Sequence, residues 1–310
     1  MKTILLLGGY GFLGSNILKY IDGCLMDAYR VIVFDKFPAH PAGVSFRCVT
    51  KTYAGDFSDT LLVENLFKEN TIDLVVHAIS TTVPSASFNA RYDVESNLLP
   101  TISLLNAMVS NKVYDIVYLS SGGAIYGNDG DCLHKETDDV FPISSYGVVK
   151  LAIEKYLMQY AILYGMRPLI LRLSNPYGPW HYSMKQGVCN VALASALKGL
   201  PFSVWGDGES LKDYIFVEDF VQILFRLLEM SVCNEVINVG SGETLSVNTI
   251  LSLVQKNVPT FEWTNAEASR YDVSHFALDT SKLLSLIGDY DFVPMGDGMR
   301  KTLEWAKNYV

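Results

Sequence analysis

The sequence predicts an α/β protein with a doubly wound parallel sheet and a smaller C-terminal α/β lobe. Two features of the 310-residue chain indicate this class. Short apolar runs of strand length, such as residues 3–7 and 115–119, alternate with longer segments of helical periodicity, such as residues 92–109 and 146–164. The apolar runs are continuous, which is typical of strands in a parallel sheet that helices cover on both faces.

The first half of the chain supplies the elements of this sheet in alternating order. We expect strands at residues 3–7, 30–34, 73–77, 115–119 and 168–173, and helices at residues 15–21, 59–70, 92–109 and 146–164. In such sheets ligands bind beyond the carboxyl ends of the strands. Residues 79–80, 120–121 and 174–175, which follow three of the strands, are therefore expected to face one crevice.

A glycine-rich turn follows the first strand. Gly8, Gly11 and Gly14 would allow a tight turn, close backbone approach to a pyrophosphate, and close packing of the next helix. The N-terminus of that helix offers N–H groups and a positive dipole end to phosphates. The second strand ends at Asp35, where a carboxylate can accept hydrogen bonds from an adenosine ribose and would repel a 2′-phosphate. The pattern predicts a Rossmann-type site that prefers NAD to NADP.

Tyr146 and Lys150 are the candidate catalytic pair. Their four-residue spacing places a phenol and an ammonium on one face of a helix, one turn apart. An ammonium close to a phenol is expected to lower its pKa from about 10 towards neutrality. Such a phenol suits the removal of a proton from an alcohol that is about to lose hydride. The spacing alone is a weak signal, but it occurs once in the chain and lies downstream of the dinucleotide motif.

The composition argues against several classes of binding partner. The net charge is −9 and no basic cluster occurs, which argues against nucleic acid and anionic membranes as partners. No apolar run reaches the roughly 20 residues that span a bilayer, and no signal peptide is expected. The five cysteines are scattered without close pairs, which argues against a metal site and a disulfide framework and fits a reducing cytoplasm.

The pattern changes after residue 174. Turn-rich sequence at residues 175–181 leads into a mixture of helices and short strands. We therefore expect an NAD-binding domain at residues 1–174 and a mostly substrate-binding lobe at residues 175–310. Segments near residues 213–240 are expected to return to the first domain.

Several strings give the chain a family resemblance. Residues 7–14 (LGGYGFLG) match the pattern T-G-G-x-G-F-I-G, residues 172–179 (RLSNPYGP) match R-x-x-N-x-x-G, and residues 213–215 (DYI) match part of R-D-Y-I. With Y-x-x-x-K, these strings make the chain resemble the extended short-chain dehydrogenases/reductases of the NAD-dependent epimerase/dehydratase family. Within that family it is similar to the UDP-glucose 4-epimerase-like enzymes, over nearly its whole length.

The resemblance implies roles for residues at both ligands. The expected cofactor-binding residues are Gly8, Gly11, Phe12, Leu13, Gly14, Asp35, Asp56, Phe57, Ala78, Asn97, Tyr146 and Lys150. The expected substrate-binding residues are Ser80, Ser121, Asn175, Trp205, Lys212, Arg270 and Phe276. The expected catalytic residues are Tyr146, Lys150 and Ser121.

Three positions depart from the family pattern. The usual active-site hydroxyl position holds Gly122, so Ser121 is the better candidate, as in members with T/S-G-G-A-x-Y-G. Lys212 replaces the arginine of R-D-Y-I, which keeps the charge but loses the bidentate fork for a diphosphate. Leu7 replaces a threonine, which matters little because backbone N–H groups meet the phosphates.

The implied reaction is epimerisation of a nucleotide sugar, with a UDP-hexose as the expected substrate. Tyr146 would take the proton of the C4 hydroxyl, Lys150 would support the phenolate, and Ser121 would bind the same oxygen. The transient 4-keto sugar would turn about its diphosphate and be reduced on its opposite face. A 4,6-dehydratase would need an acid and a base where Gly123 and Ala124 stand. A nucleotide-sugar 4-reductase or dehydrogenase stays open, as does, more remotely, a non-catalytic NAD-binding protein.

Sugar identity, assembly and pathway are not determined by these residues. Phe276 aligns with a position that gates N-acetyl groups in the family, so its bulk favours plain glucose and galactose. Residues 80–84 depart from the family forms and would reshape the sugar pocket. The family pairs the helices at residues 92–109 and 146–164 in a homodimer, and polysaccharide biosynthesis is a reasonable setting.

Overall fold

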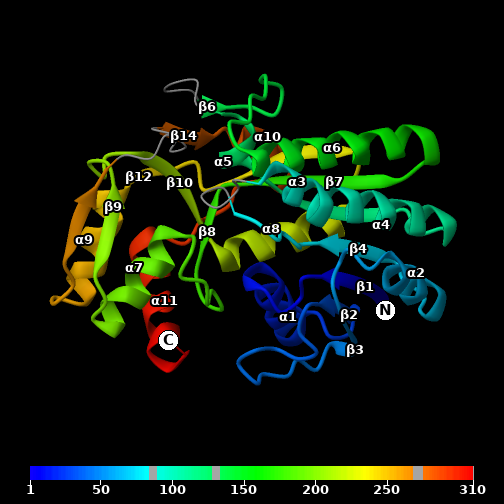
Figure 1. Ribbon diagram of the computed structural model, residues 1–310, viewed down its shortest axis with the longest axis horizontal. Coiled ribbons are helices and arrows are strands. Elements are labelled where there is room, and N and C mark those ends of the chain that lie inside the picture. The colour runs from blue at the N-terminus through cyan, green and yellow to red at the C-terminus, as the bar shows by residue number, and fades with distance from the viewer. Residues whose placement is uncertain (84–88, 128–132, 268–274, 310) are drawn as a thin grey trace. The chain divides into compact units, whose positions relative to one another are not determined.

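The computed structural model describes residues 1–83, 89–127, 133–267 and 275–309 (Figure 1). The chain divides into two compact units. Unit 1 contains Met1–Ser121, Ser144–Arg172 and Glu229–Ile237, and unit 2 contains Gly122–Ile143, Leu173–Leu228 and Asn238–Val310. The prediction was a boundary at residue 174 with segments near 213–240 returning to the first domain. In the structure only Glu229–Ile237 of that stretch belongs to unit 1, and Gly122–Ile143 belongs to unit 2.

Unit 1 is built on a seven-stranded sheet with the order β11-β7-β5-β4-β1-β2-β3. The pairs β1–β2, β1–β4, β2–β3 and β4–β5 are parallel, and the predicted fold class is confirmed. Consecutive strands run outward on both sides of β1, so the order reverses between β1 and β4, where such folds bind ligands. The strands are β1 (Lys2–Leu7), β2 (Tyr29–Asp35), β3 (Val49–Ala54), β4 (Leu74–His77), β5 (Asp115–Ser121), β7 (Arg167–Leu173) and β11 (Glu235–Val239).

The pattern of apolar runs does not predict β3. None of its residues is buried, and its sequence mixes polar with apolar side chains. These properties are usual for a strand at the edge of a sheet, which one neighbour alone covers. At the opposite edge, β11 comes from the segment expected to return to the first domain, whereas residues 213–228 group with unit 2.

The helices of unit 1 cover this sheet. They are α1 (Phe12–Cys24), α2 (Thr60–Glu69), α3 (Ala90–Asp93), a π-helical turn η2 (Val94–Leu98), α4 (Leu99–Ser110) and α6 (Ser145–Tyr164). α2 contacts α4, and α4 contacts α6, with which it runs side by side (Figure 1). None of the helices in the described ranges is both long and apolar enough to cross a membrane.

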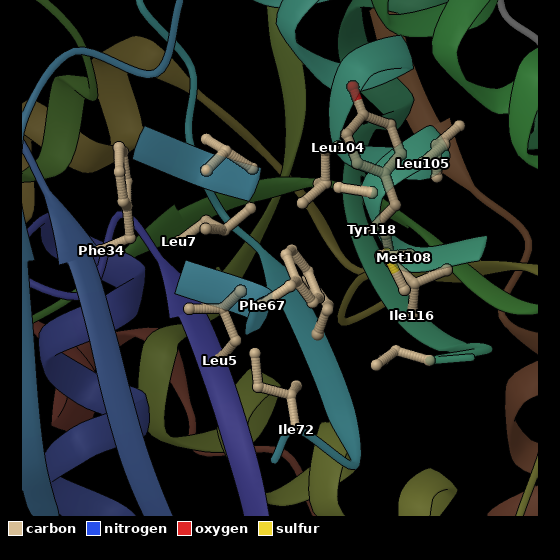
Figure 2. Close-up of a cluster of buried hydrophobic side chains, with 14 of the residues drawn as sticks. Leu5, Leu7, Phe34, Phe67, Ile72, Leu104, Leu105, Met108, Ile116 and Tyr118 are labelled. Carbon is tan, nitrogen blue, oxygen red and sulfur yellow. The ribbon is translucent and has the colours of Figure 1, made fainter. Parts of the chain in front are cut away.

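One apolar core joins α2, α4 and α6 to the sheet (Figure 2). Leu5 and Leu7 of β1 belong to it, together with Leu104 and Met108 of α4. Successive side chains of a strand point to opposite faces of the sheet, so Leu6, which is equally buried, lies on the other face. Burial on both faces explains why the sequence of β1 is continuously apolar.

The predicted helix at residues 92–109 is interrupted. Pro100 lies in the first turn of α4 and has no N–H to donate to the preceding turn. The chain takes five residues of π-helix, η2, directly before it. Asn97 lies in this turn, and such π-helical turns are frequent at functional sites.

Local signals set both ends of α6. The Ser144 hydroxyl accepts a hydrogen bond from the Gly147 N–H at 3.1 Å and caps the N-terminus. Gly165 ends the helix with a φ of 70°, which favours glycine. Tyr146 therefore lies in the first turn of α6.

Unit 2 is a smaller mixed α/β arrangement. Its main sheet has the order β12-β10-β14-β6, with β8 paired to β10, and β9 pairs with β13 separately. Its elements are α5 (Gly122–Ile125), β6 (Leu133–His134), β8 (Asn175–Tyr177), α7 (Val188–Lys198), β9 (Phe202–Trp205), β10 (Leu211–Phe216), α8 (Val217–Glu229), β12 (Thr244–Ser246), α9 (Val247–Asn257), β13 (Trp263–Ala266), β14 (His275–Leu278), α10 (Ser281–Ile287) and α11 (Met295–Tyr309).

Candidate active site

The glycine-rich loop between β1 and α1 is tightly packed against itself. Gly8 has a φ of 80°, and its N–H donates to the Phe34 carbonyl at 2.8 Å. A Cβ on Gly14 would lie 2.2 Å from the Gly8 oxygen, so only glycine fits there. A Cβ on Gly11 would meet nothing closer than 3.4 Å. Packing therefore explains Gly14, whereas Gly11 leaves room for a ligand to approach the backbone.

The N-terminus of α1 begins directly after this loop. Its N-cap is Gly11, and no side chain caps the helix there. Phe12 and Leu13 are half-buried in the first turn. The arrangement fits a phosphate group at the helix N-terminus, where backbone N–H groups and the dipole favour an anion.

Asp35 ends β2 beside the same loop. Its Oδ2 accepts from the Tyr10 N–H at 2.9 Å and its Oδ1 from the Phe37 N–H at 3.2 Å. Each carboxylate oxygen can accept more than one hydrogen bond, so the group keeps capacity for ribose hydroxyls. The residues present therefore fit a dinucleotide whose ribose carries no 2′-phosphate.

The Asp56–Phe57 segment follows β3. Asp56 is exposed, and hydrogen bonds from Ser58 lower the pKa of its carboxyl group. Phe57 is buried, and its ring packs against Phe34 and His77 with centroids 6.2 and 5.2 Å apart. The Phe57 side chain thus serves the core, and Asp56 is the member of this pair that can meet a ligand.

Tyr146 lies among hydroxyl groups of two strand ends. It is hydrogen-bonded to Ser121, the last residue of β5, and to Ser80, which follows β4. These three predicted residues thus come together within unit 1. Burial raises the pKa of Tyr146 to about 12, and the two hydroxyl groups lower it only in part.

Lys150 lies one turn further along α6 and is buried. Its Nζ donates to the Leu119 carbonyl at 2.8 Å and lies 5.7 Å from the centre of the Tyr146 ring. Burial lowers the pKa of Lys150 to about 8, against the opposing effect of Glu154. The expectation that Lys150 lowers the pKa of Tyr146 towards neutrality is therefore wrong for the polypeptide alone, because burial of the phenol dominates.

Asn97 braces the loop after β4. Its Oδ1 accepts from the Thr81 N–H at 2.9 Å, and its Nδ2 donates to the Thr81 Oγ1 at 2.6 Å. Ala78 is held by its N–H, which donates to the Leu7 carbonyl at 3.0 Å. A pocket adjoins these groups, and Ser80, Asn97, Tyr146 and Lys150 are among the residues that line it.

Buried His77 makes the stability of the protein depend on pH. Burial, and secondly the charge of Lys150, lower the pKa of His77 from 6.5 to about 3. In the unfolded chain the imidazole binds a proton near pH 6.5. The unfolded state therefore holds more protons between about pH 6.5 and 3, and stability falls as the pH drops through this window.

The His77→Gln variant tests this dependence. Between about pH 7.5 and 5, the free energy of unfolding should fall about 2 kcal/mol more in the wild type than in the variant. Glutamine can keep a hydrogen bond to Thr101 Oγ1, which lies 3.0 Å from His77 Nε2, but cannot titrate. Urea unfolding at both pH values measures the difference, and equal falls would contradict the assignment.

The predicted substrate residues of unit 2 lie on several strands. Asn175 of β8 donates from Nδ2 to the Asp213 carbonyl of β10 at 2.8 Å. Lys212 of β10 is the register partner of Phe276 on β14. Trp205 ends β9, in the separate two-stranded sheet, and is about half exposed. Arg270 lies outside the described residues.

Phe276 is a core residue of unit 2. Its ring is 1% exposed, packs on His134 with centroids 6.2 Å apart, and belongs to a cluster with Tyr126. A Cβ on Gly122 would lie 3.1 Å from the tip of this ring. The ring thus occupies the space beside Gly122, the position where the family usually has a hydroxyl side chain.

Unit 2 also contains a pocket that the sequence reasoning missed. Its lining includes Tyr177, Tyr214, Phe216, Asp219 and Glu243. Two of these residues, Tyr214 and Phe216, stand two positions apart in β10, so their side chains lie on the same face of the strand, and this spacing was visible in the sequence.

No cluster of three potential metal ligands occurs among the residues that the structure describes.

Comparisons with known proteins agree with the fold. A model of the NAD dependent epimerase/dehydratase family matches residues 4–240. A putative UDP-glucose 4-epimerase of Methanocaldococcus jannaschii is 30% identical over 309 residues, which cover 98% of both chains. The UDP-glucose 4-epimerase of Thermotoga maritima, solved with UDP-glucose, has 28% identity and a TM-score of 0.90, and 99% of each chain is covered. The UDP-glucose 4-epimerase of Thermus thermophilus, solved with NAD, has the same identity and TM-score, over 99% of this chain and 100% of that one.

Proposed function

Because the chain belongs to the NAD-dependent epimerase/dehydratase family, we propose that it interconverts the C4 epimers of a UDP-hexose, with UDP-glucose and UDP-galactose as the pair. The chain is an NAD-dependent nucleotide-sugar epimerase, and the identity of the sugar and of the nucleotide is the proposed part. The observation that carries the proposal is the hydrogen-bonded pair Ser121 and Tyr146, with Lys150 one turn away, at the carboxyl ends of β4 and β5.

Each of these three residues has a role in the proposed reaction. Tyr146 takes the proton of the C4 hydroxyl in the oxidising half of the cycle and returns it in the reducing half. Ser121 donates a hydrogen bond to the same oxygen while it is a ketone. Lys150, held by the Leu119 carbonyl, contributes positive charge that favours the phenolate.

NAD fits the loop after β1 and the carboxylate of Asp35. When bound it supplies a hydride acceptor and, in its oxidised form, a positive charge that favours the phenolate of Tyr146. Gly8, Gly11, Phe12, Leu13 and Gly14 would hold its pyrophosphate, and Asp35 its adenosine ribose. To the sugar we assign Ser80 and Ser121 of unit 1; for Asn175, Trp205 and Lys212 a contact with the nucleotide rests on the family resemblance alone.

The test is direct. Purified protein is incubated with UDP-glucose without added reductant, and UDP-galactose is followed by anion exchange or NMR, with UDP-N-acetylglucosamine in parallel. The proposal expects a mixture of C4 epimers without net formation of NADH. Net consumption of a reductant with a 4-keto sugar would instead identify a nucleotide-sugar reductase. An unchanged UDP-glucose pool beside an epimerised N-acetylated sugar would overturn the proposed substrate and keep the reaction.

A homodimer through α4 and α6 is the proposed assembly. Both helices carry exposed apolar side chains, among them Leu99 on α4 and Val148, Ile162 and Leu163 on α6. Exposed apolar side chains that gather on one surface are usual at subunit interfaces. Light scattering at micromolar concentration should give twice the mass of one chain.

The Ile162→Asp variant sharpens this prediction. It should give the monomer mass, while Leu61→Asp, at a leucine of α2 that is also exposed, should leave the dimer intact. A monomeric wild type would contradict the assembly.

We further propose a cytoplasmic location, in keeping with the free thiols of Cys24, Cys48, Cys189 and Cys233. We also propose a role in supplying sugars for polysaccharide biosynthesis.

A further inference from the structure

Three ionisable residues lie at successive turns of α6. Tyr146, Lys150 and Glu154 follow one another at four-residue intervals and so share one face of the helix. Sequence reasoning assigned no role to Glu154, although it continues the spacing of the catalytic pair.

The end of β5 meets all three of these residues. Ser121 is hydrogen-bonded to Tyr146, and the Leu119 carbonyl accepts from Lys150 Nζ at 2.8 Å. Between them, the Ser120 hydroxyl donates to Glu154 Oε1 at 2.6 Å. Three consecutive residues of one strand are therefore each bonded to a different turn of α6.

A buried ion pair completes this connection. Glu154 is 2% exposed and Arg172 of β7 is 4% exposed. Arg172 donates from Nε to both carboxylate oxygens, at 3.2 and 3.3 Å, and from Nη2 to Oε2 at 2.8 Å. The carboxylate thus links α6 to β5 and β7.

Stability alone does not account for this pair. Removing two charges from water is costly, and apolar residues of similar volume are often equally stabilising in such places. The carboxylate nevertheless has an effect that an apolar residue would lack, because its negative charge opposes the neutralisation of Lys150 by burial. The titratable or charged groups near Lys150 are Tyr146 and Glu154 on α6, Tyr118 on β5, His77 on β4 and, through Glu154, Arg172 on β7.

We propose that Glu154 is a positioning residue, which holds the end of β5 against α6 through Ser120 and supports the ammonium form of Lys150 through its charge. The Leu119 carbonyl and the Ser121 hydroxyl lie on either side of Ser120, so the same contact places the partners of Lys150 and Tyr146. The consequence for turnover rests on the proposed function, while the effect on Lys150 does not.

The first experiment follows the Lys150 ammonium without substrate. NMR of protein with isotope-labelled lysines gives the pKa of Lys150, whose signal is assigned by its loss in Lys150→Met. Glu154→Gln should lower this pKa by about one unit, because a neutral amide of similar size replaces the buried carboxylate. Glu154→Asp should keep it near the wild-type value, and the exposed control Glu64→Gln should not change it. An unchanged pKa in Glu154→Gln would overturn the electrostatic part of the proposal.

The second experiment isolates the contact with β5. Ser120→Ala removes the hydrogen bond to Glu154 but leaves the ion pair with Arg172 in place. It should lower kcat roughly tenfold with KM unchanged, since placement of Ser121 and Lys150 affects the transition state. The exposed control Ser252→Ala should have no effect. An unchanged kcat in Ser120→Ala would overturn the positioning role, whereas a wild type without epimerase activity would overturn the proposed function and leave the NMR result decisive for Glu154.

Discussion

Replacing Tyr146 by phenylalanine is expected to lower kcat for C4 epimerisation about a thousandfold, within the range attributed to general acid–base catalysis. The change removes one oxygen, the atom that is hydrogen-bonded to Ser121 and Ser80. The ring remains to pack at the start of α6, so the fold should be kept, and NAD should still bind through the glycine-rich loop and Asp35. Turnover of UDP-glucose and NAD binding by calorimetry, measured on the same preparation, separate the two effects.

Tyr156→Phe is the matched control. It makes the same change on the same helix, at a side chain that is 37% exposed and outside the group around Ser121. Wild-type turnover is expected for it. Turnover in Tyr146→Phe within tenfold of the wild type would remove the phenol from the mechanism.

Replacing Gly14 by alanine is expected to lower the free energy of unfolding by about 2–3 kcal/mol and to abolish measurable NAD binding. The added Cβ would lie 2.2 Å from the Gly8 oxygen and 2.7 Å from the Gly9 backbone. These atoms belong to a turn that Gly8 fixes with its positive φ and its hydrogen bond to Phe34. The loop must therefore shift away from α1. Urea unfolding and calorimetric titration with NAD check both parts.

Gly11→Ala provides the comparison in the same loop. Its Cβ would meet nothing closer than 3.4 Å, so the loss of stability should stay below about 1 kcal/mol, the cost of alanine at a helix N-cap. NAD affinity should still fall, because the methyl group would occupy the space left for the pyrophosphate. Equal destabilisation by the two alanines would contradict the assignment of Gly14 to packing and Gly11 to ligand approach.

Much of unit 1 could be predicted because its strands are buried on both faces. That burial makes runs such as residues 3–7 and 115–119 continuously apolar, and α6 carries its own cap in Ser144. β3 escaped prediction because an edge strand needs no such run. The break before α4 depends on Pro100, whose position in a periodic segment did not by itself indicate a π-helical turn.

The candidate site was likewise predicted only in part. Four-residue spacing correctly placed Tyr146 and Lys150 on one helical face, and strand ends brought Ser80 and Ser121 to the phenol. For the polypeptide alone, the predicted direction of the Tyr146 pKa was wrong, because burial of the phenol dominates and only tertiary structure reveals it. The burial of Phe276 beside Gly122 likewise depends on the pairing of β14 within unit 2.

The late position of β11 in the chain has a consequence for biosynthesis. Domains generally fold as units, with N-terminal domains first as the ribosome delivers them. Here the sheet of unit 1 receives its edge strand only at Glu235–Val239, after its six other strands have been translated. Until then the outer edge of β7 lacks its strand partner, and such an edge is open to wrong pairing. In a nascent chain of this enzyme the edge of β7 therefore stays open until β11 emerges, long after the nucleotide-binding loop has been made.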